Sequence, residues 1–156
     1  YRHPGVALTV SSGDAAEPFY PAASPYVTVV GGTSLSGSAG AWTQSPWKFS
    51  GGGCTAYEPK PNFQHGVPCS TRAAADVAAI ADPQTGVATF ATSAGGWVVA
   101  GGTSVGAPLI AAAYALSGNP RGPGYSYEHA NDFRDVVPGN YNFLTGIGSP
   151  DGVRGL

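Results

Sequence analysis

The hydrophobic positions along the chain fall into short runs separated by polar turns that are rich in Gly and Pro. Compact apolar or β-branched runs of this kind are typical of buried strands. They predict four strands, at residues 5–12, 26–30, 87–92 and 96–100. We expect Gly31 and Gly32 to end the second strand, and residues 93–95 to turn the chain between the last two.

One helix is predicted at residues 104–117, where Ala and Leu dominate and Gly118 follows as a C-terminal stop. Because this stretch is apolar on all sides, we expect the helix to be buried all round. Residues 73–81 are compatible with either a short helix or a strand. Residues 33–70 show little periodicity, which predicts a long irregular region of the kind that often carries function.

Composition narrows the class of protein. The 156 residues suffice for one domain with a core, and 24 Gly and 14 Pro predict many turns. Charged residues make up 10% and the net charge is −2, which does not indicate a nucleic-acid or anionic-membrane partner. No apolar run approaches the ~18 residues of a membrane-spanning helix. The chain contains no Met, and we expect it to be a processed section of a longer precursor.

Cys54 and Cys69 lie in polar loops that are rich in Gly and Pro. Their spacing, without further Cys or His at metal-ligand distances, does not indicate zinc. We expect a disulfide, with two free thiols as the alternative. A disulfide in a weakly charged chain favours an exported protein.

The string Gly-Gly-Thr-Ser occurs twice, ending at Ser34 and at Ser104. Only Ser104 precedes a predicted helix, whose N-terminal partial charge would favour a nucleophilic hydroxyl. The alternative is a simple helix N-cap. Asp14 follows a predicted strand, where it is either a functional carboxylate at the sheet edge or part of a local turn.

A histidine base for Ser104 is not indicated. His3, His65 and His129 lie in terminal, loop and polar helical contexts, and we expect all three at the surface. A Ser-His-Asp triad is therefore not predicted.

Seven strings nevertheless resemble those of one family, the sedolisins, or serine-carboxyl peptidases. They occur in family order over nearly the whole chain. In this sequence they are 12–14 (SGD), 20–27 (YPAASPYV), 30–35 (VGGTSL), 50–54 (SGGGC), 76–77 with 81–83 (DV, ADP), 101–104 with 107–108 (GGTS, AP) and 145–150 (TGIGSP). The cysteines near the SGGG string resemble those of the secreted actinobacterial branch.

The resemblance implies a subtilisin-like α/β fold, in which a mostly parallel sheet is flanked by helices. Residues 1–156 would form one loop-rich domain, corresponding to the C-terminal section of the catalytic domain. Ser104 matches the nucleophile, and Asp14 matches the acid that forms the oxyanion hole with the Ser104 backbone N–H. Ser50, Gly51 and Gly52 match the extended segment that pairs with the substrate backbone.

The sequence departs from the family pattern in its general base. The family uses a Glu, oriented by an Asp four residues later, on a helix that would precede Tyr1. Glu128 and Asp132 have this spacing but follow the nucleophile, and we interpret them as a solvated helix face.

The calcium loop of the family is also incomplete here. Asp135 and Val136 match its start, whereas Asn142 stands where the family has its final Asp. With one carboxylate fewer, we expect calcium to bind weakly or not at all. The chemistry itself requires no cofactor.

The sequence thus predicts a secreted acid endopeptidase that acts on peptide or protein substrates together with an N-terminal section of its precursor. Two alternatives remain open. One is a catalytically inactive sedolisin-like module for binding or structure, and the other is an unrelated secreted binding domain.

Overall fold

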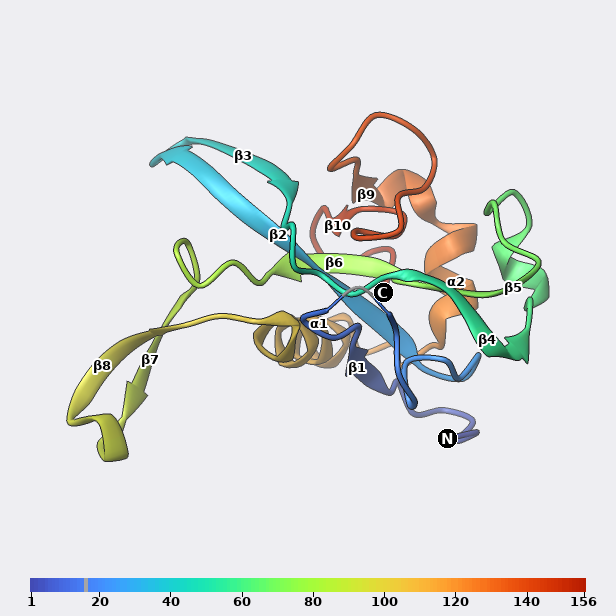
Figure 1. The fold of residues 1–156 in the computed structure, drawn as a ribbon, viewed down its shortest axis with the longest axis horizontal. Helices are drawn as coiled ribbons and strands as arrows, with labels where there is room; N and C mark the ends of the chain where they lie inside the picture. Colours follow the sequence, from blue (N-terminus) through green and yellow to red (C-terminus); the bar gives the residue numbers. More distant parts are fainter. Residues whose placement is uncertain (16) are drawn as a thin grey trace.

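A short parallel sheet forms the centre of the protein, which a computed structural model describes at residues 1–15 and 17–156 (Figure 1). β1 (Thr9–Ser11), β2 (Thr28–Ser38) and β6 (Val77–Ile80) run parallel in the order β1-β2-β6. β3 (Ala41–Pro46) pairs antiparallel with the outer half of β2. The sheet is therefore mostly parallel, as the resemblance implies.

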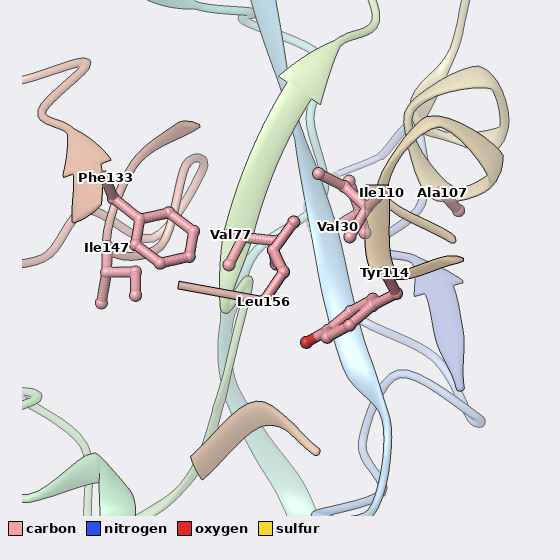
Figure 2. Packing of buried hydrophobic residues seen from close by; sticks show 8 residues of the cluster. All are labelled: Val30, Val77, Ala107, Ile110, Tyr114, Phe133, Ile147 and Leu156. Atoms are coloured by element: carbon pink, nitrogen blue, oxygen red, sulfur yellow. The ribbon is translucent and has the colours of Figure 1, made fainter. Parts of the chain in front are cut away.

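One long helix, α1 (Thr103–Ser117), packs against β1, β2 and β6 and ends at Gly118, which adopts a left-handed conformation. The predicted helix is confirmed to within one residue. Its inner face joins side chains from the sheet and from the C-terminal part of the chain in one core cluster (Figure 2). The buried members are Val30, Val77, Ala107, Ile110, Tyr114, Phe133, Ile147 and Leu156.

The opposite face of the sheet is also covered. Val29, next to Val30 in β2, points to this face and packs with Val27, Ala74 and Ala75. Neighbouring residues of a strand alternate between its two faces, so β2 is buried on both sides over this stretch. This explains why its sequence is a continuous apolar run and does not alternate with polar residues.

The remaining elements are short and surround the sheet. β4 pairs with β5, β7 with β8, and β9 with β10, all antiparallel. Their bounds are β4 (Gly53–Pro59), η1 (Asn62–Gln64), β5 (Thr71–Ala74), β7 (Val87–Ala91), η2 (Thr92–Ala94), β8 (Gly96–Ala100), α2 (Pro123–Glu128), η3 (Ala130–Asp132), β9 (Phe133–Arg134) and β10 (Ser149–Pro150). Among the described residues, no helix is long and apolar enough to cross a membrane.

The glycines of β2 do not end the strand, so the predicted boundary at residues 31–32 is wrong. A Cβ on Gly31 would lie 2.1 Å from the carbonyl oxygen of Leu144, and one on Gly32 would lie 2.7 Å from the Cβ of Ala81. Glycine is needed here because other parts of the chain pack directly onto the strand, which continues to Ser38.

The prediction of an irregular region at 33–70 is also wrong, because the outer half of β2, β3 and β4 all lie within it. Residues 73–81 are divided between β5 and β6, which decides for strand over helix. The first strand is shorter than predicted, since only Thr9–Ser11 pair with β2. The predicted strands at 87–92 and 96–100 are confirmed as β7 and β8.

The expectation that α1 is buried all round is wrong, because the outward face of the helix is exposed in the described structure. Leu116 is 80% exposed and Leu109 39% exposed on the outward face of the helix. The β7–β8 hairpin, which projects from the body in Figure 1, also exposes Phe90 and Trp97, the latter to 74%. These apolar surfaces have the composition of a protein interior, and a two-stranded hairpin is marginally stable by itself.

A fully buried ion pair ties the loop before β6 to the sheet. Arg72 and Asp76 are 0% exposed, and the Asp76 carboxylate accepts Arg72 Nη1 at 2.7 Å and the Val29 N–H at 2.8 Å. Tyr127 donates to Asp76 Oδ1 at 3.1 Å. Burial, and after it the charge of Asp76, raises the pKa of Tyr127 well above its ordinary value, so the phenol remains a donor.

The predicted disulfide between Cys54 and Cys69 is confirmed, with the two Cα atoms 5.6 Å apart. The disulfide links β4 to the loop before β5, and β4 also pairs with β5 itself.

Removal of this disulfide is expected to lower the free energy of unfolding by about 3 kcal/mol, the value of the chain-entropy model for a loop of about 15 residues. Urea unfolding of the Cys54→Ala/Cys69→Ala variant measures this loss. Alkylation without reductant should add no mass to the wild-type protein, and two labelled thiols would contradict the pairing.

Candidate active site

Ser104 occupies the second position of α1 and is exposed. The helix begins at Thr103 and its N-cap is Gly102, so Ser104 is not the capping residue. The first N–H groups of a helix lack intrahelical acceptors and carry partial positive charge. In the described part of the chain no hydrogen bond engages the Ser104 hydroxyl, which therefore faces solvent at the electropositive end of the helix.

Asp14 lies at the same end of the helix and contacts the residue before Ser104. Its Oδ1 accepts the Thr103 backbone N–H at 2.8 Å and the Thr103 hydroxyl at 2.8 Å. The Asp14 carboxyl therefore caps α1 from another segment of the chain, and its interaction is not confined to a local turn. Asp14 is therefore hydrogen-bonded to the residue that directly precedes Ser104, at the start of α1.

Gly102 allows this approach. Its φ of +92° is in the region that favours glycine, and a Cβ built on it would lie 2.6 Å from Asp14 Oδ2. Any side chain at this position would displace the carboxyl. The second glycine of the string therefore serves the packing of Asp14 at the start of the helix, whereas a Cβ on Gly101 would meet Pro83.

Thr103 is a residue of the site that sequence reasoning missed. It is 0% exposed, and its hydroxyl also accepts the Gly13 N–H at 3.1 Å. The signal was its position inside the Gly-Gly-Thr-Ser string, directly before Ser104, but only the fold brings residues 13 and 14 to it.

The predicted substrate segment is fastened to this edge through Ser50 and Gly51. Ser50 is 2% exposed, and its hydroxyl accepts the Gly32 N–H at 2.9 Å and donates to the Leu144 carbonyl at 2.9 Å. Gly51 donates its N–H to the Gly13 carbonyl at 2.7 Å. The Ser50 side chain thus holds the segment in place, and its contacts are all internal.

The glycines of this segment are also needed for packing within the chain. A Cβ on Gly51 would lie 2.4 Å from the Ser12 carbonyl oxygen, and one on Gly52 would lie 1.9 Å from the Phe143 carbonyl oxygen. Gly52 is half-buried. Its predicted role toward a substrate backbone stays a prediction.

A general base is not brought to Ser104 by the described residues. Glu128 ends α2 and lines a cavity beside Asn119 and Arg121, which follow the C-terminus of α1. Ser104 lies at the other end of this helix, whose 15 residues span about 22 Å. Glu128, and Asp132 four residues after it, are therefore remote from Ser104.

The cavity beside Glu128 has a volume of about 1000 Å³. Its walls combine the aromatic side chains of Tyr26, Phe63 and Tyr125 with the guanidinium of Arg121. Neither Ser104 nor Asp14 lines this cavity, so it is separate from the candidate catalytic residues.

The residues of the predicted calcium loop do not fit a tight calcium site. Asn142 Oδ1 already accepts the Leu144 N–H at 2.9 Å, as part of a turn closed by backbone bonds between Asn142 and Gly146. Asp135 is exposed and Val136 half-buried. Within residues 1–15 and 17–156, no three His, Cys, Asp or Glu side chains cluster around a cation position.

Removal of calcium with EDTA is accordingly expected to change the melting temperature of the protein little, because Asp135 is the single carboxylate matched in the loop. Differential scanning calorimetry with and without chelator measures this. A fall of more than about 10 °C would show that a tight site forms after all.

Comparison with known proteins identifies relatives of one kind. Searches against protein-family models find no match. The chain is 35% identical to kumamolisin from Bacillus sp. (strain MN-32), in an alignment that covers 86% of this chain. It is 34% identical to xanthomonalisin from Xanthomonas sp. (strain T-22), in an alignment that covers 61% of this chain. It covers 31% of the first protein and 14% of the second, so it spans a third or less of these relatives.

Among solved structures, the fold matches Pseudomonas sedolisin, a serine-carboxyl proteinase solved in complex with two molecules of pseudo-iodotyrostatin. The TM-score is 0.76 at 29% identity, over 94% of this chain and 54% of that one. The sequence match to kumamolisin and the structural match to Pseudomonas sedolisin each cover most of this chain.

Proposed function

Because the chain belongs to the sedolisin family in sequence and in fold, we propose that it is part of a serine-carboxyl peptidase that hydrolyses peptide bonds in acid. The observation that carries this proposal is the Asp14 carboxyl, held by Thr103 at the start of α1 beside an exposed Ser104. Peptides or proteins are the substrates, and the described chemistry needs no cofactor.

The reaction proceeds through an acyl-enzyme. Ser104 Oγ attacks the scissile carbonyl carbon while a carboxylate base takes its proton. The negative charge that forms on the carbonyl oxygen is stabilised by the Asp14 acid and the Ser104 backbone N–H. When the C–N bond breaks, the base returns the proton to the leaving amine, and water then hydrolyses the ester.

Asp14 must carry a proton for this role, because only the neutral carboxyl donates a hydrogen bond and the ionised form would repel the oxyanion. Activity is therefore expected in acid and lost toward neutral pH. The loss of one such donor typically lowers the rate by about 10²–10³.

The base is supplied by an N-terminal section of the same protein, by resemblance a Glu oriented by an Asp. Two observations support such a section. The described residues bring no base to Ser104, and α1 and the β7–β8 hairpin expose apolar side chains such as Leu116 and Trp97. The disulfide and the low charge support secretion.

A catalytically inactive binding module is the second candidate. It is favoured by one observation, the distance of Glu128 from Ser104 along α1.

Casein cleavage at pH 4 by the full-length protein and by the 156-residue chain tests the proposal. We expect activity in the first and none in the second. A folded full-length protein without activity would favour the inactive module, and an active isolated chain would show that the base lies within these residues, with Glu128 the first to replace.

A further inference from the structure

Resting on the proposed function, we propose that Thr103 is a positioning residue that decides which oxygen of Asp14 carries the acid proton. Both donors of Thr103, its backbone N–H and its hydroxyl, are directed at the same oxygen, Oδ1, each at 2.8 Å. The proton of the neutral acid is thereby confined to Oδ2, the oxygen that must donate to the oxyanion.

The orientation of the Thr103 hydroxyl is fixed by its second bond. Its oxygen accepts the Gly13 N–H at 3.1 Å, and it has one proton of its own to donate. With the Gly13 bond on the oxygen, that proton points to Asp14 Oδ1. Thr103 is 0% exposed, so solvent does not compete for the hydroxyl.

The electrostatics of the neutral carboxyl follow from these bonds. If the proton were on Oδ1, it would occupy one of the lone pairs of that oxygen, and at least one of the two hydrogen bonds from Thr103 would be lost. With the proton on Oδ2, Oδ1 keeps both bonds as an acceptor. Oδ2 lies beside Gly102, where a Cβ would come within 2.6 Å, and so faces the turn that leads into Ser104.

Thr103 connects two segments of the chain that are far apart in sequence. Gly13 and Asp14 follow β1, whereas Thr103 follows the β7–β8 hairpin. The three hydrogen bonds of Thr103 therefore reach residues that are 90 positions (Gly13) and 89 positions (Asp14) away in the sequence. A residue that merely began the helix would need no hydroxyl partner on another segment.

The test uses the full-length protein with Thr103→Val, which has a similar shape but no hydroxyl, and Thr103→Ser, which keeps the hydroxyl. We expect Thr103→Val to lower kcat by about 10- to 100-fold, less than the loss of about 10²–10³ for an oxyanion donor removed outright, with KM nearly unchanged. Thr103→Ser should retain most of the activity. If Thr103→Ser is as impaired as Thr103→Val, the hydroxyl is not the active feature and the proposal is overturned.

A double-mutant cycle separates positioning from a general structural effect. In an Asp14→Ala background, Thr103→Val should cost less than about twofold more, because Thr103 acts through Asp14. An equal loss in both backgrounds would overturn the proposal. If Thr103→Val does not fold, Thr103→Cys, a weaker donor, takes its place in the cycle. Ser104→Ala keeps the two hypotheses apart, since activity that survives it contradicts the proposed function itself.

Discussion

Ser104→Ala in the full-length protein is expected to abolish peptide hydrolysis, with a loss in kcat of about 10⁶, the size found when the nucleophile of a serine peptidase is removed. The alanine variant keeps the oxyanion donors and the fold but cannot form the acyl-enzyme. Progress curves with a chromogenic peptide at acid pH measure the loss. Activity within tenfold of wild type would show that another group is the nucleophile.

The chain contains a matched control for this variant. Ser34 ends the other Gly-Gly-Thr-Ser string but lies in β2, and its hydroxyl donates to Asp82 Oδ2 at 2.6 Å. This hydrogen bond makes the largest contribution to the lowered pKa of Asp82. Ser34→Ala should therefore raise the pKa of Asp82 toward its ordinary value and leave the rate of peptide hydrolysis close to that of the wild type.

Asp14→Asn is expected to behave differently from Ser104→Ala. An amide still donates a hydrogen bond to the oxyanion but cannot ionise, so part of the activity should survive and its fall toward neutral pH should flatten. The pH–rate profile from pH 3 to 7 shows this directly. An unchanged profile would mean that Asp14 does not cause the acid dependence.

Asp76→Ala is expected to lower the free energy of unfolding by about 3–5 kcal/mol, the cost of leaving one member of a buried ion pair without its partner. Arg72 would keep a charge at 0% exposure. Burial by itself lowers the pKa of Arg72. The attraction of the Asp76 charge and the hydrogen bond to it more than offset burial, so the pKa of Arg72 is raised. The Val29 N–H would also lose its acceptor. Urea unfolding measures the loss.

A second Asp–Arg pair serves as the control. Asp151 and Arg134 are 56% and 68% exposed, and their contact of 2.7 Å lies in solvent. Water replaces a lost partner at such a site, so Asp151→Ala should leave the unfolding midpoint nearly unchanged. Equal losses in the two variants would show that burial does not decide the contribution of Asp76.

The sequence by itself determined the features that depend on neighbouring residues and on motif order. The Ala- and Leu-rich stretch before Gly118 became α1, and the apolar runs at 87–92 and 96–100 became the β7–β8 hairpin. The ordered strings identified the family, and the Gly- and Pro-rich surroundings of Cys54 and Cys69 predicted their disulfide, although Cys54 lies in β4. In each case the physical cause lies within a short stretch or in the resemblance of whole strings.

Only the tertiary structure decided what depends on contacts between distant segments. Gly31 and Gly32 were interpreted as a strand end, because the sequence does not show that the Leu144 carbonyl and Ala81 pack against them. Ser50 is likewise buried because it is hydrogen-bonded to Gly32 and Leu144, which are distant from it in the sequence. Thr103 acquires its three bonds only when the turn after β1 meets the start of α1. Local pattern records propensity and periodicity, whereas close packing and hydrogen-bond partners follow from the folded chain as a whole.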